Sequence, residues 1–183
     1  MEVKGTAFVA REKAMVAAFG EARWKAFLQA AAEQLPLFRR RVTALTRMPV
    51  ADFLALNDRL VNEFFGGDPL AFWQMGEKSA EWGLTDGPYA IYRRDRNIEA
   101  FVRETLPSIW TGYFSRGKVV GTIADKVVDV RIQEVPVLHP YFELVVMGYC
   151  RRGFELVAGQ SKPEKIAGAQ KPGDEIHYRF QVG

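Results

Sequence analysis

The stretch HPYFELVVMGYCRRGFELVAG, residues 139–159, is the segment from which the fold can be worked out. It predicts one buried helix, because Phe142, Val146, Tyr149 and Gly153 recur on a single helical face. A glycine in the middle of a helix costs roughly 0.5–1 kcal/mol relative to alanine. At Gly153 that cost is offset either by close approach of the helix to a sheet or by room for an apolar ligand.

The segments on both sides of this helix have the two-residue period of β-strands. VVGTIA (119–124) and VVDVRIQE (127–134) precede it and are joined by a tight connection at Asp125 and Lys126. A weak strand (165–169), a turn (171–174) and EIHYRFQV (175–182) follow it. Apolar and polar residues alternate, which predicts an antiparallel sheet with one dry and one wet face. His177 alternates outward, and we expect it to be solvated.

The front of the chain has mainly helical periodicity. Residues 3–9 predict a short strand or extended entry, and residues 37–47 fit either a helical turn or a loop. Helices are predicted over residues 10–19, 21–34, 49–65, 69–82 and 98–114. Pro107 lies inside the last of these, so we expect a kink or break there.

These elements predict an α+β fold. A helical half, about residues 1–117, packs on a four-stranded antiparallel sheet in a second half, about residues 118–183. The sheet consists of two hairpins that flank one helix. No linker, repeat or low-complexity segment interrupts the sequence, so we expect one domain over residues 1–183.

The composition fits a soluble globular protein with a large aromatic interior. Of 183 residues, 48% are hydrophobic and 26% are charged, and 13 phenylalanines and 4 tryptophans predict an aromatic core or an apolar cavity. No segment approaches the roughly 18 consecutive apolar residues of a membrane span. The first residues lack the order of a signal peptide. We therefore predict a cytoplasmic protein.

The basic residues form three short clusters, but acidic residues lie among them and the net charge is only +3. This balance indicates solvated surfaces, and we do not expect a nucleic-acid partner. The clusters are Arg39–Arg41, then Arg93, Arg94 and Arg96, then Arg151 and Arg152.

No catalytic motif is present, since GxSxG, Walker, GxGxxG, HExxH and CxxC patterns are all absent. His139 and Glu143 are four residues apart on a helix, but two ligands are too few for a metal site. Cys150 stands beside Arg151 and Arg152, whose charges would lower its pKa if the thiol were exposed. Because no partner base is visible, we expect a structural or incidental thiol, and we predict neither catalytic residues nor a metal site.

Short motifs carry a resemblance to a known superfamily. VKGTAF (3–8), followed by a helix that ends in FGEARW (19–24), resembles the start of haem-nitric-oxide-binding (H-NOX) domains. The strand pair, helix and strand pair that end in GDEIHYRFQV (173–182) resemble H-NOX domains and vinyl-reductase-like domains. The small core subunits of the TRAPP tethering complex share this superfamily. MPVADFL (48–54) through LAFWQMGEKSAEWG (70–83) is similar to an uncharacterised bacterial family of this length.

The resemblance implies ligand-binding or adaptor roles. These are haem and diatomic gases in H-NOX domains, small apolar molecules in vinyl-reductase-like domains, and protein contacts in TRAPP subunits. H-NOX domains hold haem through a histidine on the helix before the sheet and through a Tyr-x-Ser-x-Arg motif. Here residues 97–117 contain no histidine, and IQEVP (132–136) stands in place of that motif. We therefore expect no cofactor, haem included.

The leading hypothesis is a non-enzymatic sensory or ligand-binding domain. An apolar pocket between the helical half and the dry face of the sheet would hold a small hydrophobic molecule. The alternatives are an adaptor that acts as a TRAPP-subunit-like homodimer or contacts a signalling protein, a haem-based gas sensor, and last an enzyme. The predicted pocket wall is Phe101, Trp110, Phe114, Phe142, Val146, Tyr149, Gly153 and Phe180.

Overall fold

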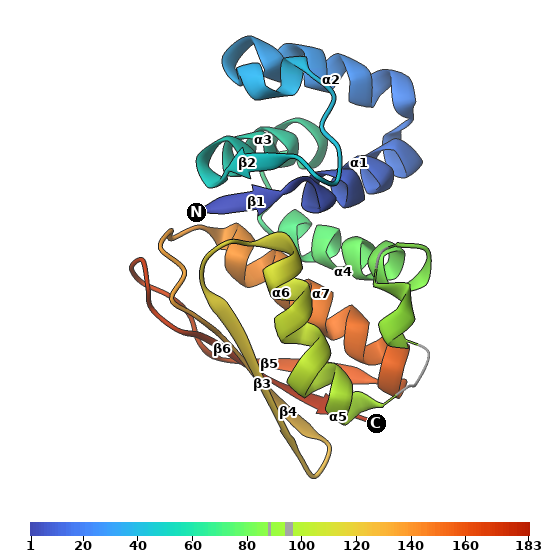
Figure 1. Ribbon diagram of the computed structural model, residues 1–183, viewed down its shortest axis with the longest axis vertical. Coiled ribbons are helices and arrows are strands. Elements are labelled where there is room, and N and C mark those ends of the chain that lie inside the picture. Colours follow the sequence, from blue (N-terminus) through green and yellow to red (C-terminus); the bar gives the residue numbers. More distant parts are fainter. Residues whose placement is uncertain (88, 94–96) are drawn as a thin grey trace.

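The computed structural model describes residues 1–87, 89–93 and 97–183, and it stacks an N-terminal helical part on a part that contains the main sheet (Figure 1). A short antiparallel pair, β1 with β2, ties the N-terminus to the start of α3. The helical part contains β1 (Glu2–Lys4), α1 (Gly5–Phe19), α2 (Glu21–Gln34), η1 (Pro36–Arg39), β2 (Arg47–Pro49), α3 (Val50–Phe65) and α4 (Leu70–Thr85).

The first helix begins earlier than the sequence predicts. Only Glu2–Lys4 is a strand, and α1 begins at Gly5, so the strand or extended entry expected for residues 5–9 is wrong. The backbone N–H of Gly5 donates to the carbonyl of Thr46 over 2.7 Å, and a side chain at Gly5 would collide with the carbonyl of Thr43. The glycine therefore lets the 43–46 segment cross closely over the start of the helix.

The helix quoted above, α7 (Pro140–Ala158), packs against α4 more closely than side chains would permit. A Cβ atom at Gly76 of α4 would collide with the carbonyl of Val145, and one at Gly148 of α7 would collide with the carbonyl of Trp73. Each helix therefore offers a glycine to the backbone of the other. Gly153 instead lies against Phe101 and Leu84, so the space beside it is filled by side chains.

The helix before the sheet is broken next to Pro107, as the sequence predicts. Asn97 caps its start by accepting a hydrogen bond from the N–H of Ala100 over 3.1 Å. Because proline has no N–H, the turn before it widens into a π-helix. The segment consists of η2 (Ala90–Arg93), α5 (Ile98–Ala100), the π-helical η3 (Phe101–Thr105) and α6 (Leu106–Tyr113).

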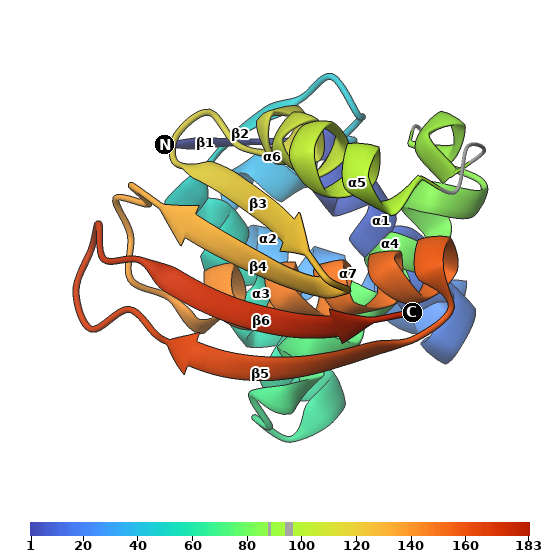
Figure 2. The same ribbon diagram turned by 90° about the horizontal axis from the view of Figure 1, so that it is seen from below.

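The main sheet is antiparallel with strand order β3-β4-β6-β5, which confirms the predicted α+β fold with two hairpins flanking one helix. Seen from below, α7 lies behind the sheet, α6 lies beside its β3 edge, and no helix covers the near face (Figure 2). Asp125 and Lys126 adopt φ values of 48° and 65°, the left-handed pair of a tight hairpin turn. The strands are β3 (Lys118–Ala124), β4 (Val127–Gln133), β5 (Ser161–Ala167) and β6 (Ile176–Val182).

The dry face of the sheet and the buried sides of α6 and α7 form the centre of the core. Val128, Val130 and Ile132 of β4 and Phe180 of β6 are completely buried. The Phe180 ring lies 5.0 Å from that of Phe154 in α7. None of the helices in the described ranges is long and apolar enough to cross a membrane.

Candidate functional site

A cavity of about 50 Å³ lies where the helical part meets α6, α7 and β3, and we call it the site cavity. Its wall is apolar except for a few hydroxyl groups and one thiol. The residues that line it are Ala7 and Ala10 of α1, Ser79 of α4, Leu106, Ile109, Trp110 and Tyr113 of α6, Phe114, Val119 of β3, and Tyr141, Val145, Val146, Tyr149 and Cys150 of α7.

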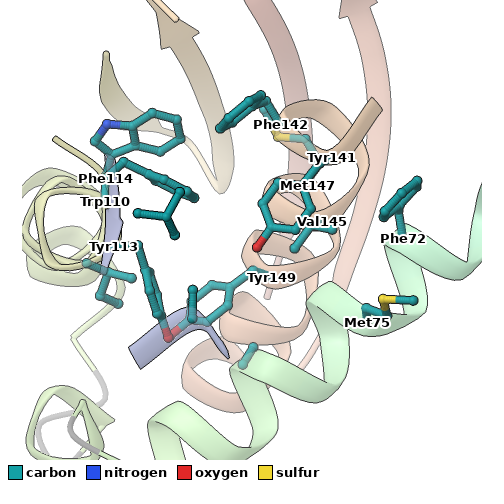
Figure 3. Close-up of a cluster of buried hydrophobic side chains, with 14 of the residues drawn as sticks. Phe72, Met75, Trp110, Tyr113, Phe114, Tyr141, Phe142, Val145, Met147 and Tyr149 are labelled. Atoms are coloured by element: carbon teal, nitrogen blue, oxygen red, sulfur yellow. The ribbon is translucent and has the colours of Figure 1, made fainter. Parts of the chain in front are cut away.

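Aromatic rings form most of the wall (Figure 3). The centroids of Trp110 and Phe114 are 4.5 Å apart, and Phe114 meets Tyr141 of α7 at 6.4 Å. Tyr113 of α6 and Tyr149 of α7 approach each other edge to face at 6.4 Å. Most of the wall therefore has two sides, one carried by α6 and its C-terminal neighbour Phe114, and one carried by α7.

The hydroxyl groups of two buried wall tyrosines lack hydrogen-bond partners among the described residues, and both lie near Gly83 of α4. They belong to Tyr113 and Tyr149. Burial raises the pKa of both phenols well above the ordinary tyrosine value, so both stay protonated as hydrogen-bond donors at neutral pH. Buried polar groups without partners are uncommon in native proteins, so these hydroxyls mark a place where a bound group could serve as the partner.

A buried cation lies beside the site cavity. Arg11 of α1 is 1% exposed, and its Nε donates to Oδ1 of Asn57 in α3 over 3.1 Å. Its Nη1 has no hydrogen-bond partner among the residues that the structure describes, and no ion pair is found for it there. Burial lowers the pKa of the guanidinium, whereas interaction with Tyr141 and Tyr113 raises it. Arg11 thus lies next to two of the tyrosines that line the site cavity.

Cys150 is a structural thiol in this arrangement. It is 1% exposed, and burial raises its pKa to about 12, so the thiolate form is rare at neutral pH. Arg151 and Arg152 do not act on it, because they form ion pairs with Glu77, Glu81 and Glu155. In the basic cluster that begins at Arg93, the residues Arg94 and Arg96 lie outside the described residues.

The two histidines have structural roles outside the site cavity. Nδ1 of His139 accepts a hydrogen bond from the N–H of Tyr141 over 3.0 Å and caps α7, while Nε2 contacts Asp58. His177 is 7% exposed, and its Nε2 lies 2.6 Å from Oδ1 of Asp129. The expectation that His177 is solvated is therefore wrong. No cluster of three residues able to hold a metal ion occurs in residues 1–87, 89–93 and 97–183.

Four of the eight predicted wall residues line the site cavity: Trp110, Phe114, Val146 and Tyr149. The other four lie elsewhere in the core. Phe142 packs behind Phe114, with ring centroids 5.6 Å apart. Gly153 lies against Phe101, and Phe180 packs on Phe154. The rings of Phe101 and Phe154 are 6.0 Å apart, so these residues form a second apolar layer.

The wall residues that the sequence analysis missed come mainly from α1 and from the starts of α6 and α7. Ala7 was missed because residues 3–9 predict a strand or extended entry, and Ala10 was missed although it is the first residue of the helix predicted over residues 10–19. Tyr141 lies at the first turn of α7 and follows Pro140, outside the stripe from which the wall was predicted. No sequence signal marks Arg11 as buried, because an arginine in an amphipathic helix is ordinarily exposed.

The fold is that of H-NOX domains. A double variant of the Tt H-NOX domain matches with a TM-score of 0.72 at 12% identity, over 98% of this chain and 94% of that chain. An Fe(II) unliganded H-NOX variant from K. algicida matches with a TM-score of 0.68 at 14% identity, over 98% and 96%. A structure that concerns the modulation of haem redox potential through porphyrin distortion matches with a TM-score of 0.68 at 14% identity, over 98% of this chain and 99% of that chain. No family model and no curated protein matches the chain.

These neighbours contradict the expectation that the chain has no cofactor. That expectation relied on the missing histidine and the missing Tyr-x-Ser-x-Arg motif. Structures with this fold, however, include one that concerns the redox potential of a haem and one in the Fe(II) unliganded state. The fold is therefore one that carries a cofactor in its neighbours, and the absence of two motifs is not sufficient reason to exclude one.

The residues around the site cavity do not fit a haem as they are arranged. The cavity of about 50 Å³ is far below the roughly 300–1,000 Å³ of sites for larger ligands. No histidine lines it, and the donor atoms in its wall are phenol oxygens, the Ser79 hydroxyl and the Cys150 thiol. A macrocycle would enter only if the rings of Trp110, Tyr113 and Tyr149 moved apart.

Proposed function

We propose that the chain is a non-enzymatic, sensory ligand-binding domain whose ligand is a small molecule held in the site cavity. The observation that carries this proposal is an apolar cavity lined by Tyr113 and Tyr149, whose hydroxyls have no partner in the described part of the chain. A core that served packing alone would gain by filling this space and by removing these hydroxyls.

The position of the site cavity supports a sensory role. Its wall is shared by α1 of the helical part and by α6 and α7, which cover the sheet. A ligand there contacts both parts, and it stabilises whichever relative arrangement it fits best. The turn before α6 is π-helical, an irregularity that is frequent at functional sites.

The experiment is native mass spectrometry of the full chain purified under mild conditions, compared with the denatured chain. We expect an excess mass that is released on denaturation. Ala10→Val adds two methyl groups to the cavity wall and should remove the excess, whereas the matched control Ala32→Val in α2 should keep it. The absence of excess mass, together with no thermal stabilisation by any small molecule in a screen, would rule the proposal out.

The fold favours a haem-bound form as a second candidate, since its neighbours include haem and Fe(II) structures. Tyrosine and cysteine can ligate haem iron, but Tyr113, Tyr149 and Cys150 belong to a wall that does not fit a haem as it is arranged, so a haem-bound form requires this wall to open. The test is titration of the purified chain with haemin. A saturable shift of the Soret band at one equivalent supports this candidate, and a spectrum that remains that of free haemin removes it.

A homodimer or a signalling protein partner stays a prediction. Light scattering across a range of chain concentrations tests the dimer, and a monomer at every concentration would remove it.

A further inference from the structure

Among the residues that the structure describes, no counter-charge is in contact with Arg11. The side chain is 1% exposed, and the partner of its Nε is Oδ1 of Asn57, a neutral group. The side chain of Asn57 also has a second hydrogen bond, because its Nδ2 donates to the carbonyl of Phe53 over 2.7 Å. Taking a guanidinium out of water without an anion is costly, and proteins usually satisfy such a group with a carboxylate or a bound anion.

Arg11 lies next to residues that line the site cavity. Arg11 follows Ala10, a wall residue, and it interacts with Tyr141 and Tyr113, both of which line the cavity. The Tyr141 hydroxyl is a hydrogen-bond partner of the guanidinium and belongs to a residue of the cavity wall. Burial raises the pKa of Tyr141, and the nearby guanidinium opposes that rise. The Arg11 guanidinium and the Tyr141 hydroxyl are therefore two hydrogen-bond donors next to the apolar site cavity.

We propose that the ligand of the site cavity is a small carboxylate with a short apolar body. Arg11 supplies the counter-charge, Tyr141 donates a hydrogen bond to the carboxylate, and the body lies against Leu106, Ile109 and Trp110. This inference rests on the proposed function, because it assigns a ligand class to the same cavity. Hydrogen bonds between a cation and a carboxylate are about twice as strong as those between neutral groups, which favours an acid over its amide.

The size of the cavity limits the apolar body to a few carbon atoms. A volume of about 50 Å³ compares with the roughly 10–15 Å³ of such space that one water molecule needs. Acetate and propionate are therefore suitable probes, and acetamide and propionamide are their neutral counterparts of nearly the same shape. A long-chain acid would require the aromatic wall to open.

The test is titration of the full chain with these four compounds, followed by amide chemical shifts and by thermal stability. We expect propionate to bind at least tenfold more tightly than propionamide, with the largest shifts in α1 and at the start of α7. Arg11→Met should reduce propionate affinity at least tenfold and leave that for propionamide unchanged. The control Arg23→Met, on the exposed face of α2, should change neither.

The outcomes separate this inference from the proposed function. If propionate and propionamide bind equally, or if Arg11→Met leaves the preference for the acid intact, the inference is overturned while a ligand-binding domain stands. If none of the four compounds binds and the cavity holds water alone, the inference is overturned, and the mass measurement then decides the proposed function.

Should Arg11→Met fail to fold, two other comparisons carry the test. Arg11→Lys keeps the charge and should keep the preference for the acid. Ala10→Val leaves the charge untouched and should weaken propionate and propionamide alike, because it takes space from the apolar body. An Ala10→Val variant that binds propionate as well as the unmodified chain would contradict the assignment of the cavity.

Discussion

Gly148 of α7 lies directly against the backbone carbonyl of Trp73 in α4, at a separation that leaves no room for a side chain. We predict that Gly148→Ala destabilises the protein by about 3 kcal/mol, because a backbone carbonyl cannot move aside as a side chain can. Gly153→Ala is the control in the same helix. Its new methyl group would meet side chains alone, the Phe101 ring at 3.0 Å and Leu84 at 3.6 Å, and alanine has the better helix propensity. Chemical denaturation of both variants measures the difference, and equal losses would contradict the account.

The Tyr149 hydroxyl lacks a partner within the described ranges, so its removal should help the ligand-free protein. We predict that Tyr149→Phe raises the free energy of unfolding by about 1 kcal/mol. The control is Tyr178→Phe, since the Tyr178 hydroxyl donates to Oε1 of Glu143 over 2.8 Å. That variant should lose about 1 kcal/mol. A loss in both variants would mean that the Tyr149 hydroxyl has a partner, such as a bound water molecule.

Cys150 should be inert in the folded protein. Its thiol is buried and has a pKa of about 12, so few thiolates exist at neutral pH and reagents do not reach them. We predict that Ellman's reagent labels the native chain only at the slow rate of structural opening, and that it labels one thiol per chain at once in guanidinium chloride. Fast labelling of the native chain would show that the wall near Cys150 opens readily.

Asp129 makes stability depend on pH in the acid range. Its own desolvation raises its pKa, but the hydrogen bond with His177 and the charges of Arg179, His177 and Arg131 outweigh this, and the pKa falls below the ordinary aspartate value. The carboxylate therefore stabilises the fold above the unfolded-state pKa. This contribution is lost as the pH falls through the folded-state pKa.

The stability difference between the unmodified chain and Asp129→Asn should accordingly shrink between about pH 5 and pH 2. Urea denaturation at several pH values measures it, with the exposed Asp86→Asn as the control. A difference that stays constant across this range would show that the depressed pKa does not hold in solution.

Most of the fold could be predicted because its signals are local. The alternation of Val128, Val130 and Ile132, the left-handed pair Asp125 and Lys126, and Pro107 each act within a few residues. The start of α1 could not be predicted, because Gly5 is helical on account of a segment about forty residues later in the chain. The pairing of β1 with β2 spans only three residues on each side, too few for a period.

The site was only partly predictable for a related reason. Periodicity identifies buried residues, but it does not say which buried residues border a space. The sequence period places both Phe180 and Trp110 on a buried face. In the structure, Phe180 packs on Phe154, whereas Trp110 borders the site cavity. The buried Arg11 of α1 is hydrogen-bonded to Asn57 of α3, and no pattern in the sequence predicts this contact between the two helices.

The central claim is that the site cavity holds a ligand, and a crystal structure of the chain purified without denaturation tests it most directly. We predict density for a non-protein molecule in contact with Ala10, Tyr141 and Tyr149, with an acceptor atom within hydrogen-bond distance of the Tyr141 hydroxyl. Density showing these three side chains in contact with each other, with nothing between them, would contradict the account.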